Sequence, residues 1–204
     1  MKVALFGGTG HVSQLLIDEL LSNGFKVRLL TRQPEFRFHS IEVVHGDALN
    51  LDDVSHTLEG CSAVVNCIGR LKNEGSFYSS ISENILQAMV ARGLRRYILV
   101  TNSTTKTPED KDTIWSWGGS MIFRIFFPEM LEDKETESKK VKNSDVDWTI
   151  LRLPLVLKSG KLKTFITSQY SLDGFLVSAK TVARSIVVEL KNVTNYRKML
   201  FVYE

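Results

Sequence analysis

Residues 3–17 read VALFGGTGHVSQLLI: an apolar run, then glycines, then apolar residues at helical spacing. This order predicts a buried strand, a tight turn and a helix that ends near residues 23–24, where Asn precedes Gly. Gly7 and Gly10 fall where a pyrophosphate would approach backbone N–H groups at the positive end of the helix dipole. A plain glycine-rich turn is the alternative, but the order of strand, turn and helix favours a nucleotide-binding unit.

Length and composition indicate an ordinary globular protein. The chain has 204 residues, of which 43% are hydrophobic and 24% charged, with a net charge of +3. No linker-like stretch divides it, so we expect one domain over residues 1–204, with a small substrate-side region at about 103–130 and 153–178. The slight basicity gives no indication of a nucleic-acid partner.

The cysteines and histidines predict neither disulfides nor a metal site. Cys61 and Cys67 flank an expected strand and are typical of buried thiols in a reducing compartment, while four scattered histidines complete no metal cluster. We find no charged-then-apolar leader and no apolar run of about 18 residues. These features favour a cytoplasmic protein that does not enter a membrane.

Strand and helix patterns alternate along the chain. Further short apolar strands are expected at residues 26–31, 41–45, 63–67, 96–100, 148–152 and 199–203. Helices are expected at residues 51–58, about 77–91, about 128–142 and 179–190. The alternation predicts an α/β fold, a Rossmann-like doubly wound parallel sheet with helices on both faces. In such sheets ligands bind at the carboxyl ends of the strands.

The residues after the second expected strand indicate which dinucleotide would bind. Arg32 follows Thr31 where an NAD-specific protein usually has an acid for the ribose 2′-hydroxyl. A guanidinium suits a 2′-phosphate instead, so NADP(H) is favoured over NAD(H). Arg37 could add a second charge, or it could be an ordinary solvated surface residue.

Six short motifs together carry a family resemblance. They are GGTGHVS at residues 7–13, TR at 31–32, HGDA at 45–48, NCIG at 66–69, TNS at 101–103 and DWTILRLP at 147–154. With them the whole chain resembles the atypical short-chain dehydrogenases/reductases of the NAD(P)H-binding, NmrA-like group. Within that group, its length and spacing are most similar to the biliverdin reductase B family of flavin reductases.

The resemblance implies a cofactor site at the strand ends. It places Asp47 and Ala48 at the adenine, and the backbone of Cys67, Ile68 and Gly69 at the ribose. It extends the site to the following residues: Thr9, His11, Val12, Thr101, Asn102, Pro154 and Leu155. A turn-forming role is the alternative for Asp47, and Cys67 is better interpreted as a small buried residue than as a nucleophile.

The chain departs from the usual catalytic pattern of this family. None of its five tyrosines has a Lys four residues later, although such a Lys normally lowers the pKa of the Tyr that protonates a carbonyl oxygen. Lys134 falls where the family's Lys would be, with Met130 at the Tyr position. A solvated helix face is the alternative for Lys134, because acidic residues surround it.

Four further features bear on the substrate and cofactor sites. The resemblance makes Ser103 a substrate-side hydroxyl, with a turn-forming serine as the alternative. Leu155 takes the place of a histidine that the family has after the sixth strand. The aromatic residues between 115 and 130 could wall a pocket for a flat substrate, or form core or a subunit contact. Ser13 stands where a third glycine would allow close helix-to-strand packing.

These observations support two hypotheses. The first is an NADPH-dependent oxidoreductase that passes hydride to a conjugated acceptor, such as a flavin, a quinone or a biliverdin-like tetrapyrrole, without the Tyr-Lys pair. The alternative is a nonenzymatic NADP(H)-binding redox sensor that acts through a protein partner. A homodimer is compatible with either. A sugar-nucleotide epimerase is disfavoured because it normally needs the missing Tyr and a larger substrate region.

Overall fold

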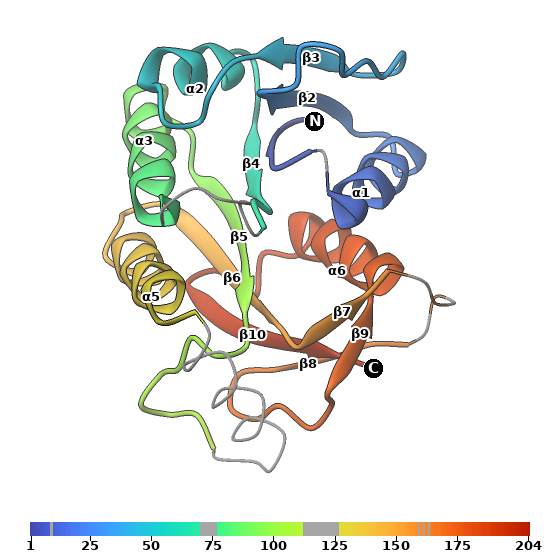
Figure 1. Ribbon diagram of the computed structural model, residues 1–204, viewed down its shortest axis with the longest axis vertical. Coiled ribbons are helices and arrows are strands. Elements are labelled where there is room, and N and C mark those ends of the chain that lie inside the picture. Colours follow the sequence, from blue (N-terminus) through green and yellow to red (C-terminus); the bar gives the residue numbers. More distant parts are fainter. Residues whose placement is uncertain (9, 70–76, 112–126, 159, 161, 163) are drawn as a thin grey trace.

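The computed structural model describes residues 1–8, 10–69, 77–111, 127–158, 160, 162 and 164–204. Its centre is an eight-stranded sheet in the order β3-β2-β1-β4-β5-β6-β10-β8 (Figure 1). The strands are β1 (Lys2–Phe6), β2 (Lys26–Thr31), β3 (Glu42–His45), β4 (Ala63–Asn66), β5 (Arg96–Asn102), β6 (Asp147–Leu153), β8 (Ile166–Ser168) and β10 (Lys198–Tyr203). The order reverses between β1 and β4, which makes the carboxyl ends of these two strands the switch point of the sheet.

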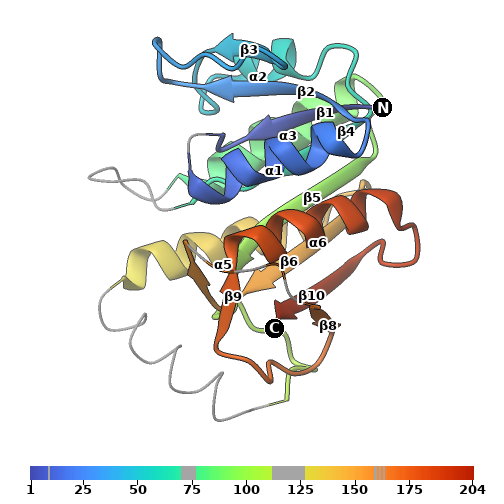
Figure 2. The ribbon, with the colours of Figure 1, turned by 90° about the vertical axis from the view of Figure 1, so that its right-hand side faces the viewer.

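Helices cover both faces of the sheet. The helices α1 (His11–Ser22) and α6 (Ala179–Lys191) lie on one face, and α2 (Leu51–Thr57), α3 (Tyr78–Ala91) and α5 (Pro128–Lys142) lie on the other (Figures 1 and 2). Each face has its own apolar core: Leu16 packs there with Ile186 on the first, and Ile85 with Val141 on the second. Strands buried on both sides explain the nearly continuous apolar runs of the sequence. The predicted α/β class is confirmed.

The last part of the sheet departs from an entirely parallel arrangement. β8 pairs antiparallel with β10 at the sheet edge, and β7 (Leu155–Leu157) pairs in parallel with β9 (Leu176–Ser178) in a separate two-stranded sheet. The sequence did not predict these three strands. Each has only three residues, too few to establish an alternating pattern.

A buried arginine fixes the loops beside this region. Arg152 of β6 is fully buried and forms an ion pair with Asp110 at 2.5 Å. It also donates hydrogen bonds to the carbonyl oxygens of Thr105, at 3.3 Å, and Gln169, at 2.9 Å. Because buried charges require such partners, Arg152 ties the loop after β5 and the loop after β8 to the sheet.

Among the described residues, no helix has the length and apolar character needed to cross a membrane. Most of the aromatic segment discussed above, residues 112–126, lies outside the described residues.

Candidate functional site

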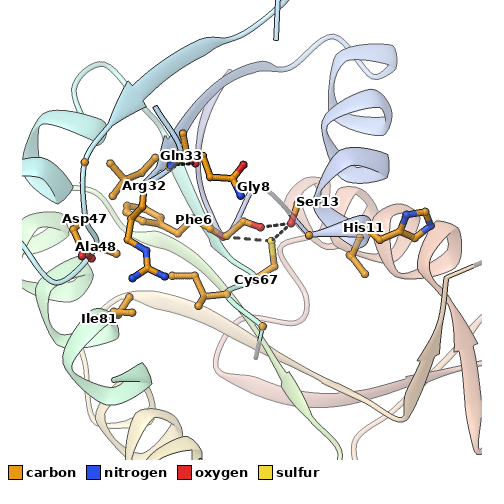
Figure 3. A pocket seen from close by; sticks show the side chains of 18 of the residues that line it. Phe6, Gly8, His11, Ser13, Arg32, Gln33, Asp47, Ala48, Cys67 and Ile81 are labelled. Atoms are coloured by element: carbon orange, nitrogen blue, oxygen red, sulfur yellow. Dashed lines mark hydrogen bonds between the residues drawn. The ribbon is translucent and has the colours of Figure 1, made fainter. Parts of the chain in front are cut away.

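A cavity of about 720 Å³ opens at the switch point, where the carboxyl ends of β1, β2, β3 and β4 meet. Many of the residues that the sequence analysis expected at the cofactor line this cavity. They are Gly7, Gly10, His11, Val12, Arg32, Asp47, Ala48, Cys67, Ile68 and Gly69. Figure 3 shows Arg32, Asp47 and Cys67, which come from separate segments, around the same space. Thr9 lies outside the described residues.

The two predicted glycines have different physical roles. Gly7 has a φ of +90°, and a β-carbon there would lie 2.6 Å from the backbone nitrogen of Ile68. A side chain at Gly7 is therefore excluded by conformation and by packing. Among the described residues, chain neighbours apart, the atom nearest to a β-carbon at Gly10 would be the Ser13 hydroxyl oxygen, at 3.8 Å. The described part of the chain thus leaves space beside Gly10.

The N-terminus of α1 is suited to an anion. Gly10 is its N-cap, and no side chain of the described residues provides a cap hydrogen bond there. Exposed N–H groups and the helix dipole favour phosphate binding at such an end. This end of α1 would therefore stabilise a bound anion.

Ser13 replaces the third glycine with a hydrogen bond. Its hydroxyl is almost fully buried and donates to the Gly7 carbonyl oxygen (Figure 3). The same hydroxyl lies 3.4 Å from the Cys67 sulfur. Burial raises the pKa of the Cys67 thiol to about 11, so the thiol is protonated near neutral pH and is a poor nucleophile. Ser13 thus links the glycine loop, α1 and the end of β4.

The segments after β2 and β3 form the other end of the cavity. Figure 3 shows the Arg32 guanidinium pointing into it. Arg37 is not among the lining residues; it instead donates to the carbonyl oxygens of Pro34, at 2.6 Å, and Phe36, at 2.9 Å. Asp47 lines the cavity and also accepts a hydrogen bond from the Leu49 N–H at 3.0 Å. The turn-forming interpretation of Asp47 is thus seen in its geometry, and its role at the adenine stays a prediction.

A second cavity of about 430 Å³ adjoins the first and shares Val12, Cys67, Ile68, Gly69 and Val156 with it. It brings together Thr101, Asn102, Met130 and Lys134, which the sequence had placed near catalysis or the cofactor. The rest of its described lining is Tyr78, Val100, Phe127 and Leu153, largely apolar or aromatic. The two cavities thus provide a cleft at the switch point beside a smaller, mainly apolar chamber.

Lys134 is buried rather than solvated. Its side chain forms an ion pair with Glu137 at 3.0 Å, and its ammonium lies 3.8 Å from the centre of the Tyr78 ring. Lys134 is only 6% exposed, so the alternative of a solvated helix face is wrong for this residue. Met130 lines the same cavity one helical turn earlier. Its thioether cannot donate the proton that a tyrosine would supply.

Three expected residues lie outside both linings. The backbone N–H of Ser103 donates to the Leu153 carbonyl oxygen at 2.8 Å, but Ser103 lines neither cavity, and nor does Pro154. Leu155 is 51% exposed, whereas Val156 lines both cavities. Successive side chains of a strand point to opposite sides, so β7 turns Val156 inward and Leu155 outward.

Sequence reasoning also missed Lys158 and Ala179, which line the first cavity. The His11 ring donates to the Lys158 carbonyl oxygen, so the segment after β7 closes against the start of α1. No strand was expected at residues 155–157, and an apolar run of three residues is too short to reveal this contact.

The fold and this cleft define a Rossmann-like dinucleotide-binding protein. A family model of NAD(P)H-binding proteins matches residues 7–192. The chain therefore belongs to the NAD(P)H-binding family.

Solved structures share the whole fold. A short-chain dehydrogenase/reductase from Veillonella parvula, in complex with NADP, has a TM-score of 0.80 and 18% identity, over 100% of this chain and 94% of that one. The oxidoreductase ylbE from Lactococcus lactis has a TM-score of 0.81 and 16% identity, over 100% and 91%. The protein chuY from Escherichia coli has a TM-score of 0.80 and 18% identity, over 100% and 97%. Similarity at this level shows a common fold.

Proposed function

We propose that this protein is an NADPH-dependent reductase that passes hydride to a conjugated acceptor. The observation that carries the proposal is the shared wall of the two cavities, Cys67 to Gly69, which would put a dinucleotide in the cleft next to an acceptor in the apolar chamber. NADPH bound in the cleft would supply the hydride. The protein's contribution is then mainly proximity, orientation and exclusion of water.

Each part of the cofactor has matching residues. The backbone around Gly10 and Val12 would hold the pyrophosphate, and Arg32 the 2′-phosphate. Asp47 and Ala48 would face the adenine, and the backbone of residues 67–69 the nicotinamide side. The absence of an acid at Thr31-Arg32-Gln33 supports NADP(H) over NAD(H).

On the acceptor side, the described lining of the second cavity offers few polar groups. Thr101, Asn102 and Lys134 would orient an acceptor carbonyl, and Lys134 would hold a proton at its Nζ atom. Flat acceptors such as quinones, flavins or a biliverdin-like tetrapyrrole suit the apolar and aromatic walls. These acceptors give stabilised anions, so the reaction does not need the missing tyrosine.

The proposal is tested by NADPH oxidation under low oxygen with a panel of quinones, flavins and biliverdins, with NADH in parallel and the nonenzymatic rate subtracted. Saturable turnover that prefers NADPH is expected. Tight NADPH binding without turnover of any acceptor would contradict a reductase and favour the redox sensor. Met130 at the tyrosine position is the observation that favours this second candidate.

A further inference from the structure

The wall of the second cavity carries a buried pair of opposite charges. Lys134 and Glu137 face each other across one turn of α5, with Nζ and Oε2 3.0 Å apart, and Glu137 is fully buried. Among the cavity's described lining residues, Lys134 is the one with a charged side chain. A cation at the edge of a mainly apolar chamber marks the place where a ligand's negative charge would be stabilised.

Glu137 is held by polar groups from three neighbouring elements. Ser82 of α3 donates its hydroxyl to Glu137 Oε1 at 2.8 Å, and the Asn66 amide of β4 donates to the same oxygen at 3.4 Å. The Tyr97 hydroxyl of β5 completes the cluster, at 3.0 Å from Ser82 and 3.1 Å from the Asn66 amide. The cluster lies where α3 and α5 run side by side over the sheet (Figure 1). The carboxylate therefore has little freedom to move.

The cluster also connects the pair to the dinucleotide cleft. Asn66 accepts a hydrogen bond from the Ile68 N–H at 3.1 Å, and Ile68 lines both cavities. On α5, Asp133 accepts a hydrogen bond from the Tyr78 N–H at 2.6 Å and so holds the start of α3. The position of Lys134 is thus set by the same elements that form the wall between the cavities.

The surroundings of Glu137 shift the pKa of its carboxyl group in opposite directions. Burial raises the pKa of Glu137, Asp133 raises it further, and the cation of Lys134 lowers it. Burial and the charge of Glu137 raise the pKa of the Tyr97 hydroxyl, which therefore stays protonated. Removing the carboxylate would leave the Lys134 ammonium without its anionic partner in largely apolar surroundings, which disfavour a charge.

We propose that Glu137 is a positioning residue that holds Lys134 as an ammonium ion at the second cavity, and that this pair selects quinone-type acceptors. The inference rests on the proposed function, which places the acceptor in this chamber. Addition of hydride to a quinone gives a hydroquinone monoanion, whose charge resides largely on a ring oxygen that one cation can pair with. A linear tetrapyrrole with two carboxylates would need a second cation that the described lining does not offer.

The test uses 4-nitrophenolate, a coloured aromatic anion, as the probe of the second cavity. Its dissociation constant is measured on the full chain between about pH 8 and about pH 10.5, a range in which the probe stays an anion and lysine side chains can begin to lose their proton. We compare wild type, Glu137→Gln and Lys134→Met. Glu132→Gln is the matched control, because Glu132 is an exposed acid on the same helix.

We expect wild type and Glu132→Gln to bind the phenolate almost equally across the series. Glu137→Gln should bind it about tenfold more weakly at the top of the range than at the bottom, because the buried ammonium then lacks the anion that favours its charged form. Lys134→Met should bind weakly at every pH. Ser82→Ala, which removes one hydrogen bond to the carboxylate, should shift the profile in the same direction by less, and it serves if Glu137→Gln does not fold.

Two results would overturn the proposal. If Glu137→Gln and Ser82→Ala keep the wild-type profile, Glu137 does not position Lys134. If Lys134→Met binds the phenolate as wild type does, the cavity is not the anion site. NADPH affinity is measured separately on each variant: failure of wild type to bind NADPH contradicts the proposed function, whereas normal NADPH binding with an unchanged phenolate profile contradicts this inference alone.

Discussion

Gly7 and Ile68 pack backbone against backbone at the switch point, so closely that a β-carbon on Gly7 would lie 2.6 Å from the Ile68 nitrogen. The contact joins the ends of β1 and β4, which are neighbours in the sheet. Because Gly7 has no side chain, the glycine loop can contact residues 67–69, which form the wall shared by the two cavities. The shape of the cleft therefore depends on this glycine.

Gly7→Ala tests this contact. We expect a loss of about 1–2 kcal/mol in the free energy of unfolding from the left-handed backbone, and about 1–3 kcal/mol more from overpacking. Gly60→Ala is the matched control, because Gly60 also has a positive φ, +67°, but a β-carbon there would have no atom of another described residue within 4 Å, its chain neighbours apart. Chemical denaturation measures both variants, and equal losses would show that packing against Ile68 contributes nothing.

Arg32→Ala tests the 2′-phosphate site. Hydrogen bonds to charged groups contribute about 1.5–3 kcal/mol, so NADPH affinity should fall by about 10- to 100-fold while NADH affinity stays nearly constant. Arg37→Ala is the control, because Arg37 is bonded to the carbonyl oxygens of its own loop. If Arg37→Ala removes the preference for NADPH and Arg32→Ala does not, the assignment of the two arginines is wrong.

Ser13→Ala tests the hydroxyl at the position of the third glycine. The variant loses the hydrogen bond to the Gly7 carbonyl, and we expect a decrease of about 1 kcal/mol in the free energy of unfolding. Gln14→Ala, an exposed neighbour on the same helix, should change it by less than about 0.5 kcal/mol. If the two substitutions change the free energy of unfolding equally, the Ser13 hydroxyl has no structural role of its own.

Cys67 should behave as an inert thiol. Since burial raises its pKa to about 11, the reactive thiolate is scarce near neutral pH, and its rate of alkylation should rise about tenfold per pH unit until the pH nears that value. Mass spectrometry of alkylated peptides measures the rate. Cys67→Ala should retain turnover with the best acceptor, and rapid alkylation at neutral pH together with an inactive Cys67→Ala would indicate a nucleophile.

The sequence predicted the order of the elements well because each central strand is an apolar run buried on both faces, as in residues 63–66. It also predicted the cavity residues that follow those strands directly, such as Arg32 and Asp47. A position after a parallel strand fixes the edge of the sheet at which a residue lies. No knowledge of distant contacts is needed there.

The remaining features depend on contacts between distant segments. Leu155 follows β6 as expected, but pairing of β7 with β9 turns its side chain outward. The helix 128–142 is mostly charged, so its sequence gives no sign that Lys134 and Glu137 are buried. Their burial results from packing against α3, β4 and β5, where Ser82 and Asn66 supply the partners of Glu137.

The central claim is that the cleft between the ends of β1 and β4 binds NADPH, since the reductase and the sensor both require it. Calorimetric titration of the full chain with NADPH and with NADH tests this claim most directly, with Gly7→Ala as the cleft variant. We predict one NADPH per chain, at least about tenfold tighter than NADH, which corresponds to about 1.4 kcal/mol, and much weaker binding by folded Gly7→Ala. No NADPH binding by wild type, or equal affinity for NADPH in wild type and Gly7→Ala, would contradict the claim.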